Sequence, residues 1–114
     1  MTSDNEKGRK RYMRLMVFFD LPVETSKQRR EYRLFRKKLL KEGYLMIQKS
    51  VYSKLVINEN AARIALGRLK KIRPPEGQVQ VLRVTEKQYV NMACIVGEAV
   101  EHEEIDSSDE VIVL

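Results

Sequence analysis

The residue best placed to do chemistry is Asp20, a carboxylate that directly follows the apolar run Leu15–Phe19. If two copies of the chain meet through this predicted strand, their Asp20 carboxylates come close across the two-fold axis. Close carboxylates favour a bound divalent cation or a raised pKa on one of them, and Mg²⁺ suits hard oxygen ligands and phosphate. Asp20 is therefore the candidate metal ligand and catalytic residue, with Mg²⁺ at the dimer interface. The alternative is that Asp20 only ends a strand before Pro22.

Other enzymatic chemistry has little support in the sequence. His102 is the only histidine and lies in an acidic stretch, which makes a histidine-based nucleophile or zinc site improbable. Cys94 is the only cysteine and falls in a predicted strand, so we interpret it as a packing residue. There is no phosphate-binding glycine loop and no dinucleotide fingerprint. An enzymatic function would have to rest on Asp20 and a metal ion.

The distribution of charge indicates a polyanionic partner. The net charge is +6, so a dimer would carry +12 (twice +6). Thirteen Lys or Arg residues lie between Lys7 and Lys41 against three acidic residues, whereas Glu98 to the end holds seven acidic residues and no Lys or Arg. This concentration of positive charge in the first part of the chain suits neutralisation of a phosphate backbone. The sequence shows no motif that would read bases, such as a recognition helix or a zinc finger. The candidate DNA-binding residues are Lys10, Arg11, Arg14, Lys27, Arg29, Arg30, Arg33, Arg36 and Lys37. The alternative is that these charges form an ordinary solvated surface.

The pattern of apolar residues and turn signals predicts an α+β fold. Thr25 with Gln28 forms a capping-box pattern, and Gly43 suits the end of the same helix. The order strand–helix–strand–strand–helix–strand is the ferredoxin-like βαββαβ arrangement, here with an additional strand near the carboxyl end. The predicted strands are 12–20, 44–48, 51–57, 79–84 and 92–96. The first predicted helix is 26–42, and the second is capped by Asn58 and ends before Pro74. A short helical turn capped by Thr85 follows the fourth strand.

In this fold both long helices cover one face of the sheet and leave the other face open. Alternation along the first strand assigns Met16 and Phe18 to the open face, together with Arg14. An exposed apolar patch requires a partner, and a second copy stacked sheet against sheet would bury it. We therefore expect a homodimer with Met16 and Phe18 in its interface.

The chain divides into three segments. We expect residues 1–10 to form a flexible tail, 11–97 the ferredoxin-like domain, and 98–114 an acidic linker and a terminal docking strand. That strand, formed by Val111, Ile112, Val113 and Leu114, suits addition to a partner's sheet edge, although it could also fold back on its own sheet. No run of apolar residues is long enough to span a membrane, and a single cysteine fits a reducing cytoplasm.

Four segments resemble the Cas2 family, the smaller of the two core CRISPR adaptation proteins, and one of them, Tyr32–Gly43, resembles the subgroup that accompanies Cas9 systems. They are Arg11–Pro22 at the first strand, Tyr32–Gly43 in the first helix, Gln48–Ser53 in the hairpin and Thr85–Gln88 after the fourth strand. The resemblance covers nearly the whole chain from Arg11 onward. It implies a ferredoxin-like homodimer in which a strand near the carboxyl end helps to join the protomers.

The resemblance also implies a function. It predicts a cytoplasmic scaffold of the spacer-acquisition complex that binds double-stranded prespacer DNA and the CRISPR repeat and bridges two dimers of the Cas1 integrase. Some relatives are described as metal-dependent nucleases that use the position of Asp20, so the alternative is a Mg²⁺-dependent endonuclease acting on single-stranded RNA or duplex DNA. An RNA-binding module of the same topology is a third possibility, but Val51–Ile57 lacks the stacking aromatics typical of that class.

Overall fold

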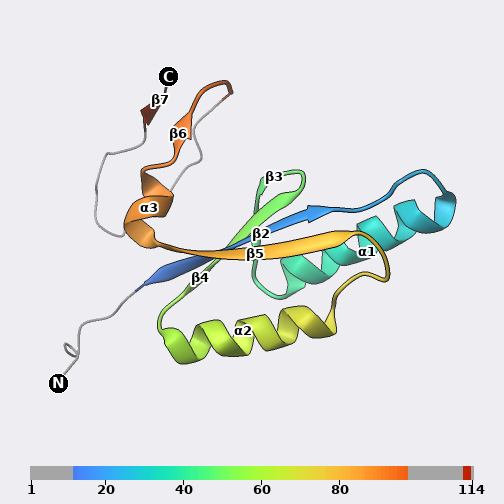
Figure 1. Ribbon diagram of the computed structural model, residues 1–114, viewed down its shortest axis with the longest axis horizontal. Helices are drawn as coiled ribbons and strands as arrows, with labels where there is room; N and C mark the ends of the chain where they lie inside the picture. Colours follow the sequence, from blue (N-terminus) through green and yellow to red (C-terminus); the bar gives the residue numbers. More distant parts are fainter. Residues whose placement is uncertain (1–11, 98–111, 114) are drawn as a thin grey trace.

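A computed structural model of the chain describes residues 12–97 and 112–113. Figure 1 shows the elements in chain order. They are β2 (Met13–Asp20), α1 (Ser26–Lys41), β3 (Leu45–Gln48), β4 (Val51–Val56), α2 (Glu59–Lys71), β5 (Gln78–Thr85), α3 (Glu86–Val90), β6 (Ala93–Cys94) and β7 (Ile112–Val113). Among these elements, no helix is long and apolar enough to cross a membrane.

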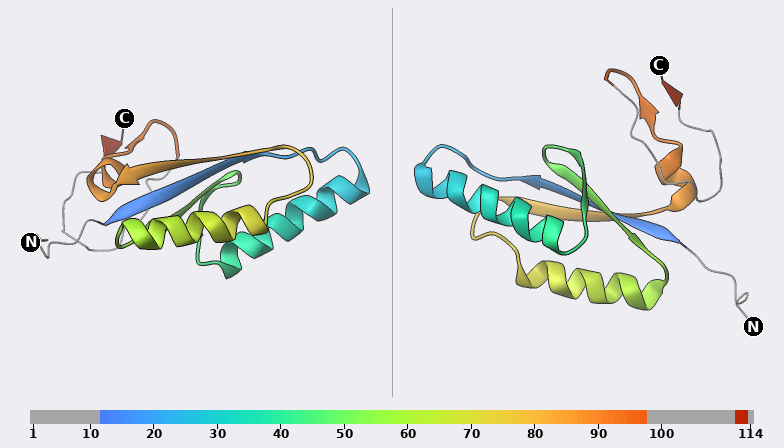
Figure 2. Two further views of the ribbon diagram at one scale, coloured as in Figure 1. Left: turned by 60° about the horizontal axis from the view of Figure 1, so that its bottom comes forward. Right: turned by 180° about the vertical axis from the view of Figure 1, so that it is seen from behind.

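The main sheet has the strand order β3-β4-β2-β5, and every neighbouring pair in it is antiparallel. Helices α1 and α2 lie together on one face of this sheet (Figure 2). The order of elements and the placement of the helices confirm the predicted α+β, ferredoxin-like arrangement. Strand β2 is central, because it pairs along its length with β4 on one side and β5 on the other.

The two long helices begin and end where the sequence predicts. In α1, the Thr25 side chain accepts a hydrogen bond from the Gln28 backbone, and the Gln28 side chain accepts one from the Thr25 backbone. These reciprocal bonds satisfy donors that the first helical turn leaves unpaired. Gly43 follows the helix with a φ of 95°, a left-handed conformation that glycine adopts without strain. Asn58 caps α2 in the same way as Thr25, by accepting a bond from Ala61 N.

The main core lies between the sheet and the two helices. Leu15, Val17 and Phe19 of β2 alternate toward this side and are buried, as predicted. Phe19 packs edge-on against Phe35 of α1, with 5.1 Å between the ring centroids. Tyr52 of β4 is fully buried, with its ring centroid 5.6 Å from that of Phe19. The apolar layer fixes how α1 sits on the sheet and therefore which side of α1 faces outward.

The opposite face of the sheet is covered at one end, contrary to the expectation that it would be open. Helix α3 follows β5 directly and packs across the start of β2. Met16 was expected to be exposed, but it is buried beneath Tyr89 and Val90 of α3. The prediction of a short helical turn capped by Thr85 was confirmed; the prediction that it leaves the sheet face bare was wrong. The reason is that Tyr89 and Val90 carry enough apolar surface to make α3 dock.

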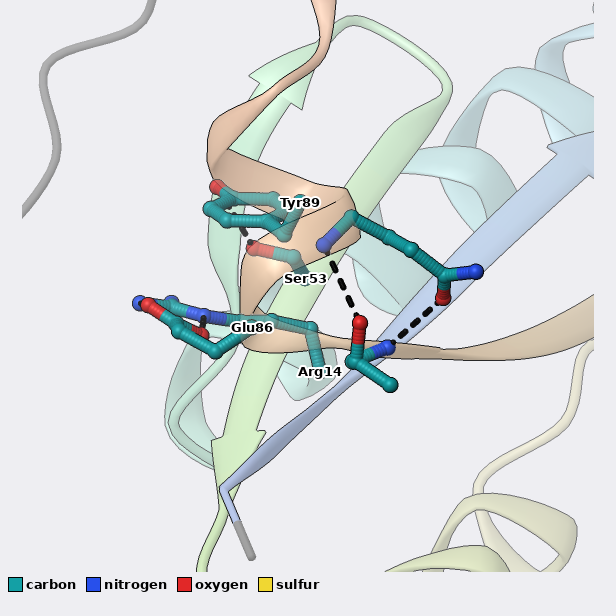
Figure 3. Close-up of polar contacts among 6 residues, drawn as sticks. Arg14, Ser53, Glu86 and Tyr89 are labelled. Carbon is teal, nitrogen blue, oxygen red and sulfur yellow. Dashed lines mark hydrogen bonds and ion pairs between the residues drawn. The ribbon is translucent and has the colours of Figure 1, made fainter. Parts of the chain in front are cut away.

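Arg14 is the polar centre of this docking, as Figure 3 shows. Its guanidinium donates two hydrogen bonds to the Glu86 carboxylate, at 2.8 and 3.0 Å, and only 4% of the residue is exposed. The Arg14 Cζ atom also lies 4.4 Å from the centroid of the Tyr89 ring. The Tyr89 hydroxyl in turn shares a hydrogen bond of 3.2 Å with Ser53 Oγ. Arg14 was expected to contact DNA. A buried guanidinium paired with a carboxylate is not exposed to a phosphate backbone, so this expectation is corrected.

Past α3, the chain makes a small second sheet. A strand was predicted over residues 92–96, but only Ala93 and Cys94 form one, β6. The terminal strand β7 pairs with β6 in parallel, within the same chain. This pairing matches the fold-back alternative for Ile112 and Val113. Docking of the terminal strand onto a partner stays a prediction.

The Arg14–Glu86 pair predicts a specific loss of stability. The substitution Glu86→Gln leaves the shape of the side chain but removes the negative charge beside a buried cation, which is costly in a low-dielectric site. We expect the free energy of unfolding to fall by about 3 kcal/mol. Urea denaturation monitored by circular dichroism measures it.

The matched control is Glu59→Gln, which breaks the exposed pair between Glu59 and Arg83. An exposed pair contributes less than about 1 kcal/mol. Equal losses for the two variants would show that the buried pair does not hold α3 on the sheet.

Candidate nucleic-acid interface

A stripe of basic residues covers the outward side of α1. The apolar residues Phe35 and Leu39 turn toward the sheet and are buried, so the opposite side of the helix is in solvent. The basic stripe is defined as the exposed residues Lys27, Arg29, Arg30, Arg33, Lys37, Lys38 and Lys41. Five of the predicted DNA-binding residues lie in it: Lys27, Arg29, Arg30, Arg33 and Lys37. Within residues 12–97, none of the stripe side chains forms an ion pair with a carboxylate.

Two of the predicted arginines make contacts with their own fold. Arg29 donates through Nη1 to the carbonyl oxygens of Val23 and Glu24, which ties the stripe to the turn that enters α1. Arg36 is half-buried and lies toward the sheet, where its Nε donates to the Tyr52 hydroxyl at 2.8 Å. That hydrogen bond raises the pKa of Arg36. Arg36 was expected on the same side as Arg33 and Lys37, but the structure places it beside the stripe.

The far end of α1 is fixed by polar contacts to neighbouring elements. Arg68 of α2 donates to both carboxylate oxygens of Glu42, at 2.6 and 3.0 Å. These bonds lower the pKa of Glu42 and raise the pKa of Arg68. Lys54 of β4 donates to the Glu42 carbonyl oxygen at 2.6 Å. Burial beside this end raises the pKa of Tyr44 to about 12, so its hydroxyl stays neutral at physiological pH. The basic stripe is therefore carried on a helix anchored at both ends.

This geometry suits contact with a phosphate backbone. Cations on one rigid face neutralise phosphates at little cost in ordering, because the helix already holds them in place. Lys10 and Arg11, which were also predicted to contact DNA, lie outside the described residues.

A second group of basic residues was missed from the sequence. Exposed cations follow one another along α2 and just after it: Arg63, Arg68, Lys70, Lys71 and Arg73. Ala62, Ala65 and Leu69 turn toward the core, so these charges lie on the solvent side of the helix. The signal was present, since four of the five fall within six consecutive positions, 68–73.

Asp20 is exposed at the end of β2, in register with Gln78 of β5. Alternation along β2 places its side chain on the same face as Phe18. Among residues 12–97 and 112–113, no three His, Cys, Asp or Glu side chains come close enough to hold a metal ion. The donor set of the described residues therefore does not fit Mg²⁺, and a site at Asp20 would need ligands from outside this set, for example from a second copy.

The apolar patch around Phe18 remains exposed beyond the edge of α3. Phe18 is 38% exposed, and two further residues of the same face, Leu45 and Leu82, are 57% and 54% exposed. We call these three residues the open-face patch. Since Met16 is buried, the predicted interface residue that remains available is Phe18. Of the predicted docking strand, Val111 and Leu114 lie outside the described residues.

Comparison with known proteins places the chain in a family. The family model for "CRISPR associated protein Cas2" matches residues 13–92. A protein of Treponema denticola named CRISPR-associated endoribonuclease Cas2 is 49% identical over 102 residues, which cover 90% of this chain and all of that protein. Proteins of the same name from Ligilactobacillus salivarius and Lacticaseibacillus rhamnosus are 46% and 52% identical, over 90% and 75% of this chain and 100% and 84% of their own lengths.

The matched region begins at β2 and runs through α3, so it includes both long helices, the whole main sheet and the Arg14–Glu86 pair. The resemblance seen in the first strand, the hairpin and the Thr85–Gln88 turn is confirmed by this match. The chain belongs to the Cas2 family of CRISPR-associated proteins.

Proposed function

We propose that the chain is a double-stranded DNA-binding scaffold of the CRISPR spacer-acquisition complex. The observation that carries this proposal is the basic stripe on α1, which is exposed, lacks ion pairs to described carboxylates and is anchored at both ends of the helix. Contacts of this kind go to the sugar-phosphate backbone, so binding depends weakly on base sequence. Prespacer DNA and the CRISPR repeat are both duplexes that such a surface accepts.

The scaffold works as a homodimer in this proposal. Two chains that stack through their open-face patches bury Phe18, Leu45 and Leu82 from both copies and leave both α1 helices on the outside. The two basic stripes then lie on the outer surface of one particle. A rigid particle of this kind supports the middle of a DNA fragment while two Cas1 integrase dimers hold its ends. The terminal strand, 111–114, is the proposed contact with those partners.

Charge reversal on the stripe tests DNA binding. We expect the double variant Arg30→Glu and Arg33→Glu to weaken duplex affinity by at least about tenfold at 0.1 M salt, equally for unrelated sequences. The slope of log K against log salt should fall by about 2, since two phosphate contacts are lost. Fluorescence anisotropy with a labelled 30-base-pair duplex across a salt series measures both quantities.

The control is the double variant Arg63→Glu and Lys87→Glu, which lowers the net charge by the same four units, from +6 to +2, at exposed positions off the stripe. If this control loses affinity to the same extent, the attraction comes from the overall charge and the stripe is not the DNA surface.

Substitution of Phe18 tests the dimer. Phe18→Asp places a charge in the proposed interface, where each buried charge has no partner. We expect the dimer dissociation constant to rise by at least about a hundredfold, measured by sedimentation velocity. The matched control is Ile64→Asp, which changes an exposed apolar residue on α2, away from the proposed interface. A dimer that persists in Phe18→Asp at micromolar concentration rejects stacking through the open-face patch.

A second candidate function is a Mg²⁺-dependent endonuclease that cleaves single-stranded RNA or duplex DNA. The printed name of the relatives, endoribonuclease, favours it, and so does the exposure of Asp20 on the face of the open-face patch. In a stacked dimer the two Asp20 carboxylates would come together and supply ligands that the described residues of one chain lack. A single carboxylate from each chain is a sparse metal site, which is why the scaffold is the leading proposal.

The variant Asp20→Ala separates the two functions. For a scaffold, we expect integration of a labelled prespacer by the complete complex with Cas1 to stay within about twofold of wild type, because no phosphate contact is lost. For a nuclease, Mg²⁺-dependent cleavage by the purified dimer should disappear. Loss of integration with normal dimerisation and normal complex assembly contradicts the scaffold proposal.

A further inference from the structure

A small pocket lies between the start of α1 and the loop that joins α2 to β5. These two segments are at the same end of the molecule in every view (Figures 1 and 2). The pocket has a volume of about 70 Å³. That is room for roughly five water molecules, which together take up about as much space as one flat heteroaromatic ring system. The pocket is therefore too small for a drug-sized ligand but fits one ring-bearing group.

The walls of the pocket are mostly apolar and are held in place. Tyr32 of α1 lines one wall, and its hydroxyl donates to the Lys49 carbonyl oxygen at 3.2 Å. Pro74 and Pro75 line the opposite wall, and their rings fix the backbone φ angle of the loop. Gly77 ends the loop in a left-handed turn, with a φ of 94°. The pocket therefore exists before any ligand binds, so that binding costs little in ordering.

The polar groups of the pocket are hydrogen-bond acceptors. Glu31 and Glu76 both line it, and neither forms an ion pair with another described residue. Gln28 also lines it, but its amide oxygen already accepts from the backbone of Glu24 and Thr25, and its amide nitrogen donates to Glu76 at 3.2 Å. Ionised carboxylates accept hydrogen bonds and cannot donate them. A ring that carries N–H donors is therefore the complementary ligand.

Cations flank the pocket on both sides. Lys27, a member of the basic stripe, lines it from α1. Arg73 directly precedes Pro74 in the opposite wall and is exposed. The pocket thus lies where the basic stripe approaches the second group of basic residues. A phosphodiester chain that crosses the pocket would be neutralised from both sides, whereas an aromatic side chain of a partner protein would gain nothing from these cations.

We propose that this pocket binds the base of an unpaired nucleotide, with a preference for guanine, while the flanking phosphates contact Lys27 and Arg73. Unpaired bases stack on aromatic side chains and form hydrogen bonds through their Watson–Crick edges. Guanine presents two adjacent N–H donors on that edge, which suit the two oxygens of one carboxylate. Thymine and uracil present one N–H between two carbonyl oxygens, which the carboxylates of Glu31 and Glu76 repel. This selectivity rests on the proposed function, because it requires a nucleic acid on the basic stripe, which by itself does not distinguish bases.

Binding of bulged duplexes by the full-length protein tests the proposal. The probes are a labelled 30-base-pair duplex that is fully paired, the same duplex with one unpaired guanine at its centre, and the same duplex with one unpaired thymine there. We expect the guanine probe to bind at least about fivefold more tightly than either of the others, measured by fluorescence anisotropy. The thymine probe controls for the change in DNA shape that any bulge causes.

The double variant Glu31→Gln and Glu76→Gln should bring the guanine and thymine probes to within about twofold of each other. Glutamine keeps the shape of both side chains and an oxygen that accepts from Gln28, so the variant should fold. The matched control is Glu24→Gln with Glu59→Gln, at exposed positions outside the pocket. Both double variants change the net charge from +6 to +8. Only the control should keep the preference for guanine.

A second measurement follows the base itself. With 2-aminopurine as the unpaired base, we expect binding to the wild-type protein to quench its fluorescence at least about twofold, because the base stacks in the pocket. Unchanged fluorescence in the bound complex contradicts insertion of the base.

The outcomes also separate this proposal from the one on which it rests. If the protein binds all three duplexes equally, the pocket does not take a base and the basic stripe still binds DNA. If it binds none of them, the scaffold proposal fails together with the pocket. If millimolar N-acetyltryptophanamide removes the guanine preference and millimolar guanosine monophosphate does not, the pocket takes a protein side chain and the assignment to a nucleotide is wrong.

Discussion

Strand β2 must be covered on both of its faces, and this constraint organises the rest of the fold. It lies between β4 and β5, so its side chains alternate between two faces that each need a cover. On one face Leu15 and Val17 pack beneath the two long helices. On the other face α3 supplies the cover, and the Arg14–Glu86 pair fixes its position. The cover stops at Met16 and leaves Phe18 exposed, at the surface through which the proposed dimer would form.

The separation of charge and apolar surface follows from the same layering. Helix α1 gives its apolar side to the sheet and therefore must present its cations to solvent. The open-face patch lies on the opposite side of the sheet. In the proposed scaffold, one surface would bind another copy and the other would bind a polyanion, without competition between them.

Much of the architecture could be predicted from the sequence, because short-range signals specify it. The Thr25–Gln28 capping box, Gly43, Asn58 and the paired prolines before Gly77 mark element boundaries that the structure reproduces within one or two residues. Alternation in β2 also identified its core side correctly. These signals act over a few residues, so they can be read without knowledge of the fold.

The errors concern contacts between distant positions. Arg14 and Glu86 are 72 residues apart, and no local pattern shows that a basic residue in a strand will be neutralised by a carboxylate from a short helix. The assignment of Met16 to an open face failed for the same reason. Arg36 was misplaced because its partner, Tyr52, comes from another element. The basic residues of α2 are visible in the sequence, but they are fewer and more widely spaced than those of α1.

The turn at Gly77 holds the start of β5 against the end of β2. A Cβ at this position would lie 2.7 Å from the Asp20 carbonyl oxygen and 3.1 Å from the Leu21 Cα, so there is no room for even one methyl group. Any residue larger than glycine would therefore force apart the two strand ends, and it would displace the backbone that carries Asp20.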